Sequence, residues 1–341
     1  MFLRLYKNFG DISYLDYARQ YIEAALTRTT PTPNYVGFLG SYTGIYTTAA
    51  IIYNELGDTL KSSKYVDLMK TAIVEGQQCT EDTFYNGKAG LLMAARMLNN
   101  YFGEEVIPQS DILIIAQLLL EDGINNGRDG YLVWHNMIFP EVVFLGQGDG
   151  STGVLTQLMQ IPQIMANETA TSYIKNTLDY YLTIQMPDGN FPTPVQSPYP
   201  DQADQLVQWC HGGPGFIPVL TLGYLAFGNE AYLRSADSAA DLLWQKGILT
   251  KGLMLGHGVS GNTYMFLYMY EKTLNPKYLY RAIKFQEFTL GSPIMVDPTI
   301  MRVPSPSPYS LYGGSYGGAV VLWSDMLTGA SYHMPGFDAY P

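Results

Sequence analysis

The chain has 341 residues, of which 47% are hydrophobic and 14% are charged, and 30 acidic against 19 basic residues give a net charge of −11. The basic residues are scattered and form no positive cluster, which argues against a nucleic-acid-binding protein. Apolar stretches such as Ile112–Leu120 are shorter than the about 20 residues that a membrane-spanning helix needs. Met1–Gly10 lacks the apolar region of a secretory signal and only two cysteines are present, so we expect a cytoplasmic protein without a transmembrane segment.

From the N-terminus onward the predicted elements are helices, because apolar residues rarely alternate with period two. A glycine turn followed by a run of apolar and small residues recurs along the chain. Its copies are Ser41–Gly44, in which serine replaces the first glycine, and then Gly87–Gly90, Gly150–Gly153, Gly212–Gly215, Gly258–Gly261 and Gly314–Gly317. The last glycines of successive copies are 46 to 63 residues apart, a spacing that fits one helical hairpin with variable loops.

Two kinds of helix alternate in this pattern. Ile45–Leu56 and Asn262–Lys272 are apolar around most of their circumference, as buried helices are. More amphipathic helices are expected at Tyr14–Leu26, Tyr65–Val74, Ser172–Gln185, Tyr232–Trp244 and Tyr278–Phe288. Buried inner helices alternating with amphipathic outer ones describe two concentric rings. We therefore predict an all-α protein, an α/α toroid, with one domain over residues 1–341. The glycines are expected to permit close backbone approach at the entry to each inner helix, with positive φ where the turn requires it.

The most specific motif is Trp209-Cys-His-Gly-Gly-Pro-Gly215. A second one runs from Lys251-Gly through Gly256-His-Gly-Val-Ser-Gly-Asn-Thr-Tyr264, and a third is Pro187-Asp-Gly-Asn-Phe-Pro192. Together these segments resemble the lanthionine synthetase C-like (LanC-like) family, in particular its eukaryotic, glutathione-binding members. The resemblance covers essentially the whole chain and implies the same toroidal fold that the repeat predicts.

The family's chemistry is zinc-assisted addition of a thiol to dehydroalanine or dehydrobutyrine residues. The resemblance implies a zinc ion that two cysteines and one histidine hold, and a separate histidine that moves protons. Here the first cysteine position is Cys210 and the ligand histidine is His257, whereas the second cysteine position is Gly256. His211 is a further candidate for a catalytic or substitute role, although the family has a histidine there that is not a ligand. Two protein ligands make an incomplete site, so zinc is an open question.

Two further positions carry the resemblance. The acid/base histidine of the family corresponds to Asp149, which is either a general base, if burial raises its pKa, or simply the N-cap of the helix that follows. Lys251 matches a lysine implied in contacting glutathione.

The first repeat looks incomplete. Leu3–Leu15 resembles the second half of the family's first repeat, without the glycine turn before it. Either the sequence is truncated at this point, or the ring is open or reduced. An open ring exposes the edge of an inner helix, which a partner would cover. The proline-rich segments Pro187–Asp204 and Pro293–Pro308 are candidate partner contacts, or else plain connectors.

Three functions remain open at this stage. The favoured one is a pseudoenzyme with a degenerate zinc site, acting as a non-catalytic binding or structural subunit of a larger assembly. The alternative is an active, zinc-dependent enzyme that adds glutathione to dehydrated residues in proteins. The third is a glutathione sensor without turnover.

Overall fold

The structure is a computed structural model that describes residues 1–137, 140–195, 206–291, 307–329 and 331–339. In these residues every regular element is a helix, and β-structure is limited to isolated bridges such as that between Gln208 and His211. The prediction of an all-α protein is confirmed. Both proline-rich segments named above lie partly or almost wholly outside the described residues.

The chain divides into two compact units. The N-terminal unit contains residues 2–143, 149–174 and 335–341, and the C-terminal unit contains residues 144–148 and 175–334. Each unit is described by itself, and the prediction of a single domain over 1–341 stays a prediction.

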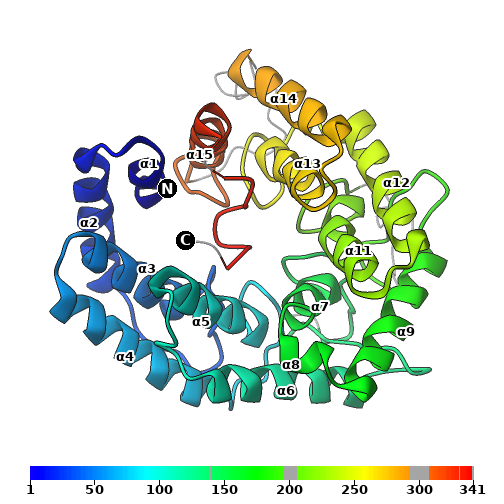
Figure 1. Cartoon of the computed structure of the whole chain (residues 1–341), viewed down its shortest axis with the longest axis horizontal. Coiled ribbons are helices and arrows are strands. Elements are labelled where there is room, and N and C mark those ends of the chain that lie inside the picture. The colour runs from blue at the N-terminus through cyan, green and yellow to red at the C-terminus, as the bar shows by residue number, and fades with distance from the viewer. Residues whose placement is uncertain (138–139, 196–205, 292–306, 330, 340–341) are drawn as a thin grey trace. The chain divides into compact units, whose positions relative to one another are not determined.

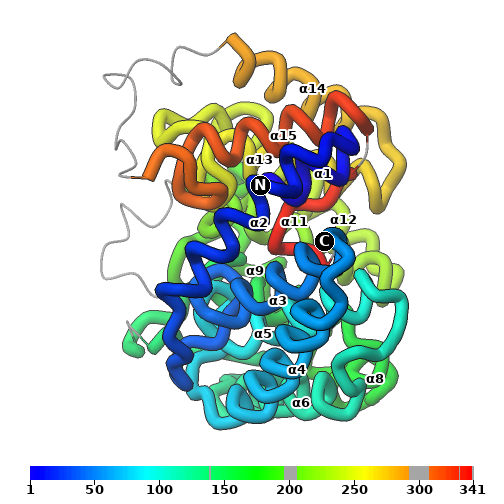
Figure 2. The backbone as a smooth tube through the Cα atoms, turned by 90° about the vertical axis from the view of Figure 1, so that its left-hand side faces the viewer, coloured from blue at the N-terminus to red at the C-terminus, as the bar shows by residue number. Residues whose placement is uncertain are grey.

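The N-terminal unit consists of a helical hairpin followed by two layers of helices. Its helices are α1 (Phe2–Phe9), α2 (Ile12–Leu26), α3 (Tyr42–Glu55), α4 (Thr59–Gly76), α5 (Lys88–Phe102), α6 (Gln109–Asn125), α7 (Ser151–Leu158) and α8 (Pro162–Met165). One layer consists of α3, α5 and α7, each of which contacts the next, and α4, α6 and α8 form the second layer over it (Figure 1). The helices α1 and α2 pair with each other, and α2 packs on α3 (Figure 2).

The C-terminal unit repeats this arrangement. It contains the larger part of α9 (Glu168–Ile184), together with α11 (Gly213–Phe227), α12 (Glu230–Lys246), α13 (Val259–Thr273), α14 (Pro276–Gly291) and α15 (Ser315–Thr328). The helices α11, α13 and α15 contact one another in that order, while α12 pairs with α11 and α14 with α13 (Figure 1). Helices that follow a glycine turn thus form one layer in each unit, as the repeat predicts.

Each glycine turn has the same role at the start of its helix. The first residue of the turn is the N-cap and the last glycine is the third helical residue, at α3, α5, α7, α11, α13 and α15 alike. A Cβ atom at Gly44 would overlap the carbonyl oxygen of Phe38, and one at Gly261 would overlap that of Leu255. The expected close backbone approach is therefore confirmed. Positive φ is the exception among these N-caps, since it occurs at Gly212 (φ 88°) while the others are extended.

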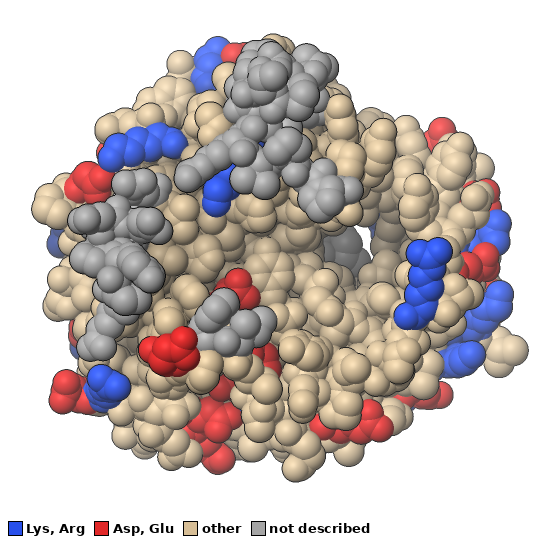
Figure 3. Space-filling view, turned by 180° about the vertical axis from the view of Figure 1, so that it is seen from behind, with Lys and Arg blue, Asp and Glu red and all other residues tan. Residues whose placement is uncertain are grey.

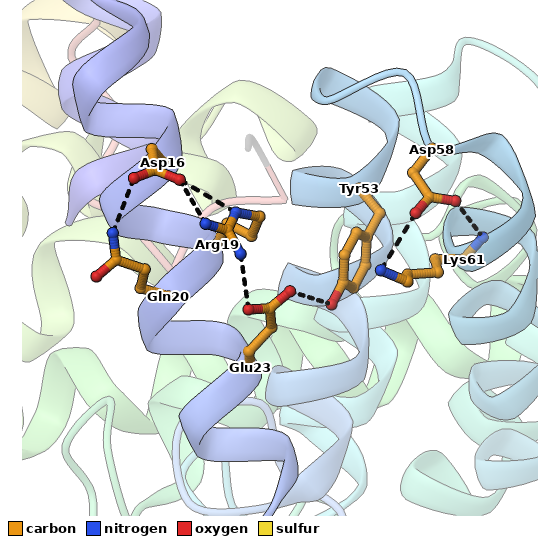
Figure 4. A network of polar contacts seen from close by, with 7 residues as sticks. All are labelled: Asp16, Arg19, Gln20, Glu23, Tyr53, Asp58 and Lys61. Atoms are coloured by element: carbon orange, nitrogen blue, oxygen red, sulfur yellow. Dashed lines mark hydrogen bonds and ion pairs between the residues drawn. The ribbon is translucent and has the colours of Figure 1, made fainter.

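Polar side chains cap the first turns of the amphipathic helices α2 and α4, and they also link α2 to α3. The helices α2 and α4 start before the predicted Tyr14 and Tyr65, because Asp11 and Asp58 cap them by accepting backbone N–H bonds. Glu23 of α2 pairs with Arg19 at 2.9 Å and accepts a hydrogen bond from Tyr53 of α3 at 3.4 Å, which ties the two helices together (Figure 4).

A buried ionic cluster lies at the start of α5. The ammonium of Lys88 is 2.7 Å from Asp82 Oδ1, 3.1 Å from Asp122 Oδ2 and 2.7 Å from the carbonyl oxygen of Cys79. Lys88 is 2% exposed, and burial raises the pKa of Asp82 to about 7. Cys79 belongs to this cluster in the N-terminal unit.

Two observations concern binding partners: the distribution of basic side chains on the surface, and the length of the apolar helices. On the face in Figure 3, the described Lys and Arg side chains lie singly or beside acidic ones. No described helix combines the length and the apolar character needed to cross a membrane.

Candidate functional site

The predicted site residues occupy equivalent places in successive repeats. Asp149, His211 and His257 each stand directly before the first glycine of a turn, at the entries to α7, α11 and α13. Cys210 and Gly256 stand one residue earlier in their own repeats. The position directly before each of these turns therefore holds a histidine or the aspartate. The position one residue earlier holds Cys210 in one repeat and Gly256 in the next.

Within the C-terminal unit, backbone hydrogen bonds join these places from loop to loop. The N–H of Cys210 donates to the carbonyl oxygen of Gly256 at 3.2 Å, and the N–H of Gly256 donates to that of Tyr312 at 3.0 Å. Tyr312 holds the same place before α15. The two positions for which the resemblance implies zinc-binding cysteines are thus direct neighbours, and one of them, Gly256, has no side chain.

A single glutamine links Lys251 to Cys210. The ammonium of Lys251 donates to Gln208 Oε1 at 3.0 Å, and Gln208 Nε2 donates to the sulfur of Cys210 at 3.1 Å. Gln208 is 3% exposed and Cys210 is 5% exposed. The backbone of Gln208 pairs with that of His211 by hydrogen bonds of 3.0 and 3.1 Å, which fixes the glutamine against the loop. The side-chain amide of Gln208 therefore lies between the ammonium of Lys251 and the thiol of Cys210.

Both histidines of this cluster are neutral at pH 7. The ring of His211 packs against Phe144 with 5.6 Å between ring centroids, and its Nδ1 is buried without a hydrogen-bond partner among the described residues. Burial, reinforced by the charges of Lys251 and His257, lowers the pKa of His211 to about 4. Burial and then Lys251 also lower the pKa of His257. The local positive charge comes from the lysine.

These residues do not fit a catalytic zinc ion. Such an ion takes three protein ligands, and the family positions supply two, Cys210 and His257. Nowhere in the described part of the chain do three or more His, Cys, Asp or Glu side chains gather closely enough to hold a metal. The sulfur of Cys210 instead accepts the amide hydrogen of Gln208.

Asp149 lies in the N-terminal unit, directly before the N-cap of α7. The N-cap of α7 is Gly150, which forms no side-chain cap, so the N-cap interpretation of Asp149 is wrong. The reason is that the turn glycine takes the capping position. Asp149 is half-buried, and burial, with the negative charge of Glu81, raises its pKa to about 6. A carboxyl group with this pKa exchanges protons near neutral pH.

Two asparagines brace the C-terminal cluster. Asn262 Nδ2 donates to the carbonyl oxygens of Val207 and Gly247 at 2.9 and 3.0 Å, and Asn190 Oδ1 accepts from Gly213 N at 2.7 Å. Trp209 is fully buried, with its ring edge-on to Tyr312, and is a core residue. Asn190 and Asn262 both stand in the segments that carry the resemblance, which is the signal that marks them. Gln208 carries no such signal.

Known proteins resemble this chain over nearly its full length. The family model described as lanthionine synthetase C-like protein matches residues 1–337. The chain is 30% identical to the glutathione S-transferase LANCL1 of Danio rerio, over 99% of this chain and 82% of that protein. It is 29% identical to the LanC-like protein GCL1 of Arabidopsis thaliana, over 90% of this chain and 71% of that protein.

Among solved structures, nisin cyclase matches with a TM-score of 0.57 and 14% identity, over 94% of this chain and 96% of that one. Nisin cyclase is an α/α toroid of the LanC-like type, so the predicted fold class is confirmed. The repeated glycine turns, the motifs before α11 and α13 and these matches lead to one conclusion: the chain belongs to the lanthionine synthetase C-like family.

Proposed function

We propose that this protein binds glutathione without the family's zinc-dependent turnover, as a pseudoenzyme. The observation that carries the proposal is the chain of contacts from Lys251 through Gln208 to Cys210, beside the glycine that replaces the third ligand. The relative from Danio rerio is named a glutathione S-transferase, which supports glutathione as the ligand.

The chemistry of the cluster suits this ligand. Glutathione carries carboxylates that a lysine ammonium attracts, and charge-assisted hydrogen bonds of this kind are among the stronger ones in proteins. The neutral rings of His211 and His257 add hydrogen-bonding nitrogens beside the lysine, and the buried Nδ1 of His211 lacks a described partner. The proposed binding uses these groups, whereas activation of the thiol by a metal requires a third protein ligand.

A second candidate is catalysis of glutathione addition to dehydroalanine or dehydrobutyrine residues. Asp149 favours it, because a half-buried carboxyl group with a pKa of about 6 is suited to move a proton near neutral pH. In this case Asp149 takes the role that the resemblance gives to a histidine.

Calorimetric titration of the full chain with reduced glutathione tests the first candidate. We expect saturable binding, weakened about tenfold or more by Lys251→Met, because a hydrogen bond to a charged group contributes about 1.5–3 kcal/mol. Lys246→Met is the matched control, since Lys246 is exposed and pairs with Asp188 at 2.9 Å. Equal affinity in wild type and Lys251→Met would overturn this assignment.

Metal analysis and an addition assay on a dehydroalanine peptide separate the remaining functions. Stoichiometric zinc that Cys210→Ala removes, with turnover that Asp149→Asn abolishes, would establish the second candidate. Absence of both glutathione binding and turnover, with co-purification in one defined assembly, would instead support the structural-subunit function, for which a protein partner is expected.

A further inference from the structure

The C-terminal tail, Pro335–Ala339, packs into the N-terminal unit, although the helix before it, α15, belongs to the C-terminal unit. It is the red segment that ends beside the label C in Figure 1. Phe337 is 1% exposed and meets the ring of Phe84 edge-on, with 5.5 Å between ring centroids. Gly336 turns the chain with φ 76°, and a Cβ atom there would lie 2.9 Å from the ring of Phe38.

Side-chain amides of the N-terminal unit bind the tail's backbone. Asn100, near the end of α5, donates to the carbonyl oxygen of Ala339 at 2.6 Å. Gln157 of α7 donates to the carbonyl oxygen of Phe337 at 3.4 Å. Hydrogen bonds to the main chain combined with a pocket for a side chain are the means by which proteins bind extended peptides.

An arginine adds charge recognition to the same place. Arg96 of α5 donates to Gln157 Oε1 at 3.1 Å and to Gln160 Oε1 at 3.2 Å, both neutral acceptors. Burial lowers the pKa of Arg96 to about 10, and the negative charge of Asp338 in the tail opposes this shift. A guanidinium removed from water requires compensating negative charge, so the acidic residue beside Phe337 matches this position.

We propose that Phe84, Arg96, Asn100 and Gln157 line a peptide-binding groove whose resident ligand is the chain's own tail. The groove recognises an aromatic residue followed by an acidic one. The tail leaves it without unfolding a helix, because its contacts come from a few residues beyond α15. A free peptide with the same aromatic–acidic sequence therefore competes with the tail for the groove.

The test uses the full chain and a fluorescent synthetic peptide with the sequence of residues 333–339. We expect Phe337→Ala to bind this peptide saturably, and wild type to bind it at least about tenfold more weakly, because the attached tail acts at high effective concentration. A peptide with alanine in place of the phenylalanine is the control, and it is expected to bind neither protein.

Two results would overturn the proposal. One is a folded Phe337→Ala protein, checked by circular dichroism, that fails to bind the peptide. The other is equal binding by wild type, which would show that the tail does not occupy the groove. If Phe337→Ala does not fold, Asn100→Ala is the second variant, since Asn100 is exposed. Hydrogen exchange at residues 336–339 should then be at least about tenfold faster than in wild type, and unchanged exchange would contradict the proposal.

Discussion

The backbone N–H of Cys210 donates to the carbonyl oxygen of Gly256 across 3.2 Å, so Cys210 is the direct neighbour of the position for which the resemblance implies a second cysteine. Gly256 is not among the described glycines with positive φ, so its φ is one that a residue with a side chain can adopt. We expect Gly256→Cys to complete a ligand set with Cys210 and His257 and to bind about one zinc ion per chain. Metal analysis after gel filtration measures this.

The control for this variant is the double change Gly256→Cys with His257→Ala, which returns the set to two protein ligands. It is expected to lose the zinc that the single variant gains, whereas Gly256→Ser should gain none. A Gly256→Cys protein that is folded and free of zinc would show that the loop has changed in more than one residue.

Asp149 should make stability depend on pH in an unusual direction. Its pKa is about 6 in the folded chain against an ordinary 3.8, so the folded state binds more protons than the unfolded state between these values. The stability from this group is therefore present below pH 3.8 and is lost as pH rises through 6. Asp149→Asn should be more stable than wild type at pH 7.5, by at most about 3 kcal/mol, and the gain should shrink towards pH 4. Denaturant unfolding at several pH values measures it.

Asp188→Asn is the control with the opposite sign. A hydrogen bond from Lys246 holds the pKa of Asp188 below its ordinary value, so this variant should be less stable than wild type at neutral pH. Stabilisation by both substitutions would indicate a general effect of net charge and not the burial of Asp149.

The last glycine of each turn should be intolerant of any side chain. At Gly261 a Cβ atom would overlap the carbonyl oxygen of Leu255, which belongs to the backbone and cannot rotate away. We expect Gly261→Ala to destabilise the protein by about 1–3 kcal/mol or more, as overpacking does. Gly291→Ala is the matched control, because a Cβ there meets no atom of the described residues within 4 Å. Thermal unfolding of the two variants should separate them clearly.

The buried ionic cluster yields a further prediction. Lys88→Met leaves Asp82 buried beside a neutral side chain, and breaking a buried pair in this way typically costs about 3–5 kcal/mol. Lys70→Met removes an exposed lysine that pairs with Asp67, and it should change stability by less than about 1 kcal/mol. Similar losses in urea unfolding would contradict the structural importance of the cluster.

The fold was predictable because the repeat is visible in the sequence. At positions such as 44 and 261 a side chain would overlap a neighbouring backbone carbonyl oxygen, so glycine recurs there. Cys210, Gly256 and His257 were predicted from the resemblance of their segments to the family's motifs, and the structure places them just before the turns that start α11 and α13. Their roles stay predictions.

Other features depend on packing between distant segments. Gln208 joins Lys251 to Cys210 through geometry that no local pattern encodes, because glutamine is equally common on a surface. Phe337 reads as one more apolar residue, and its contact with Phe84 appears only in the folded chain. Asp149 was open to an N-cap interpretation because the sequence does not say which residue of the turn caps α7.

The equivalent places before each helix have an evolutionary consequence. A residue there changes the chemistry of the protein and leaves the hydrogen bonds between the loops intact, because those bonds use backbone atoms at Cys210 and Gly256 alike. A glycine codon and a cysteine codon can differ by a single base. A cysteine at position 256, which the resemblance to the family implies there, is therefore one point mutation away from the glycine that this chain has, and the hydrogen bonds between the loops do not depend on which of the two is present.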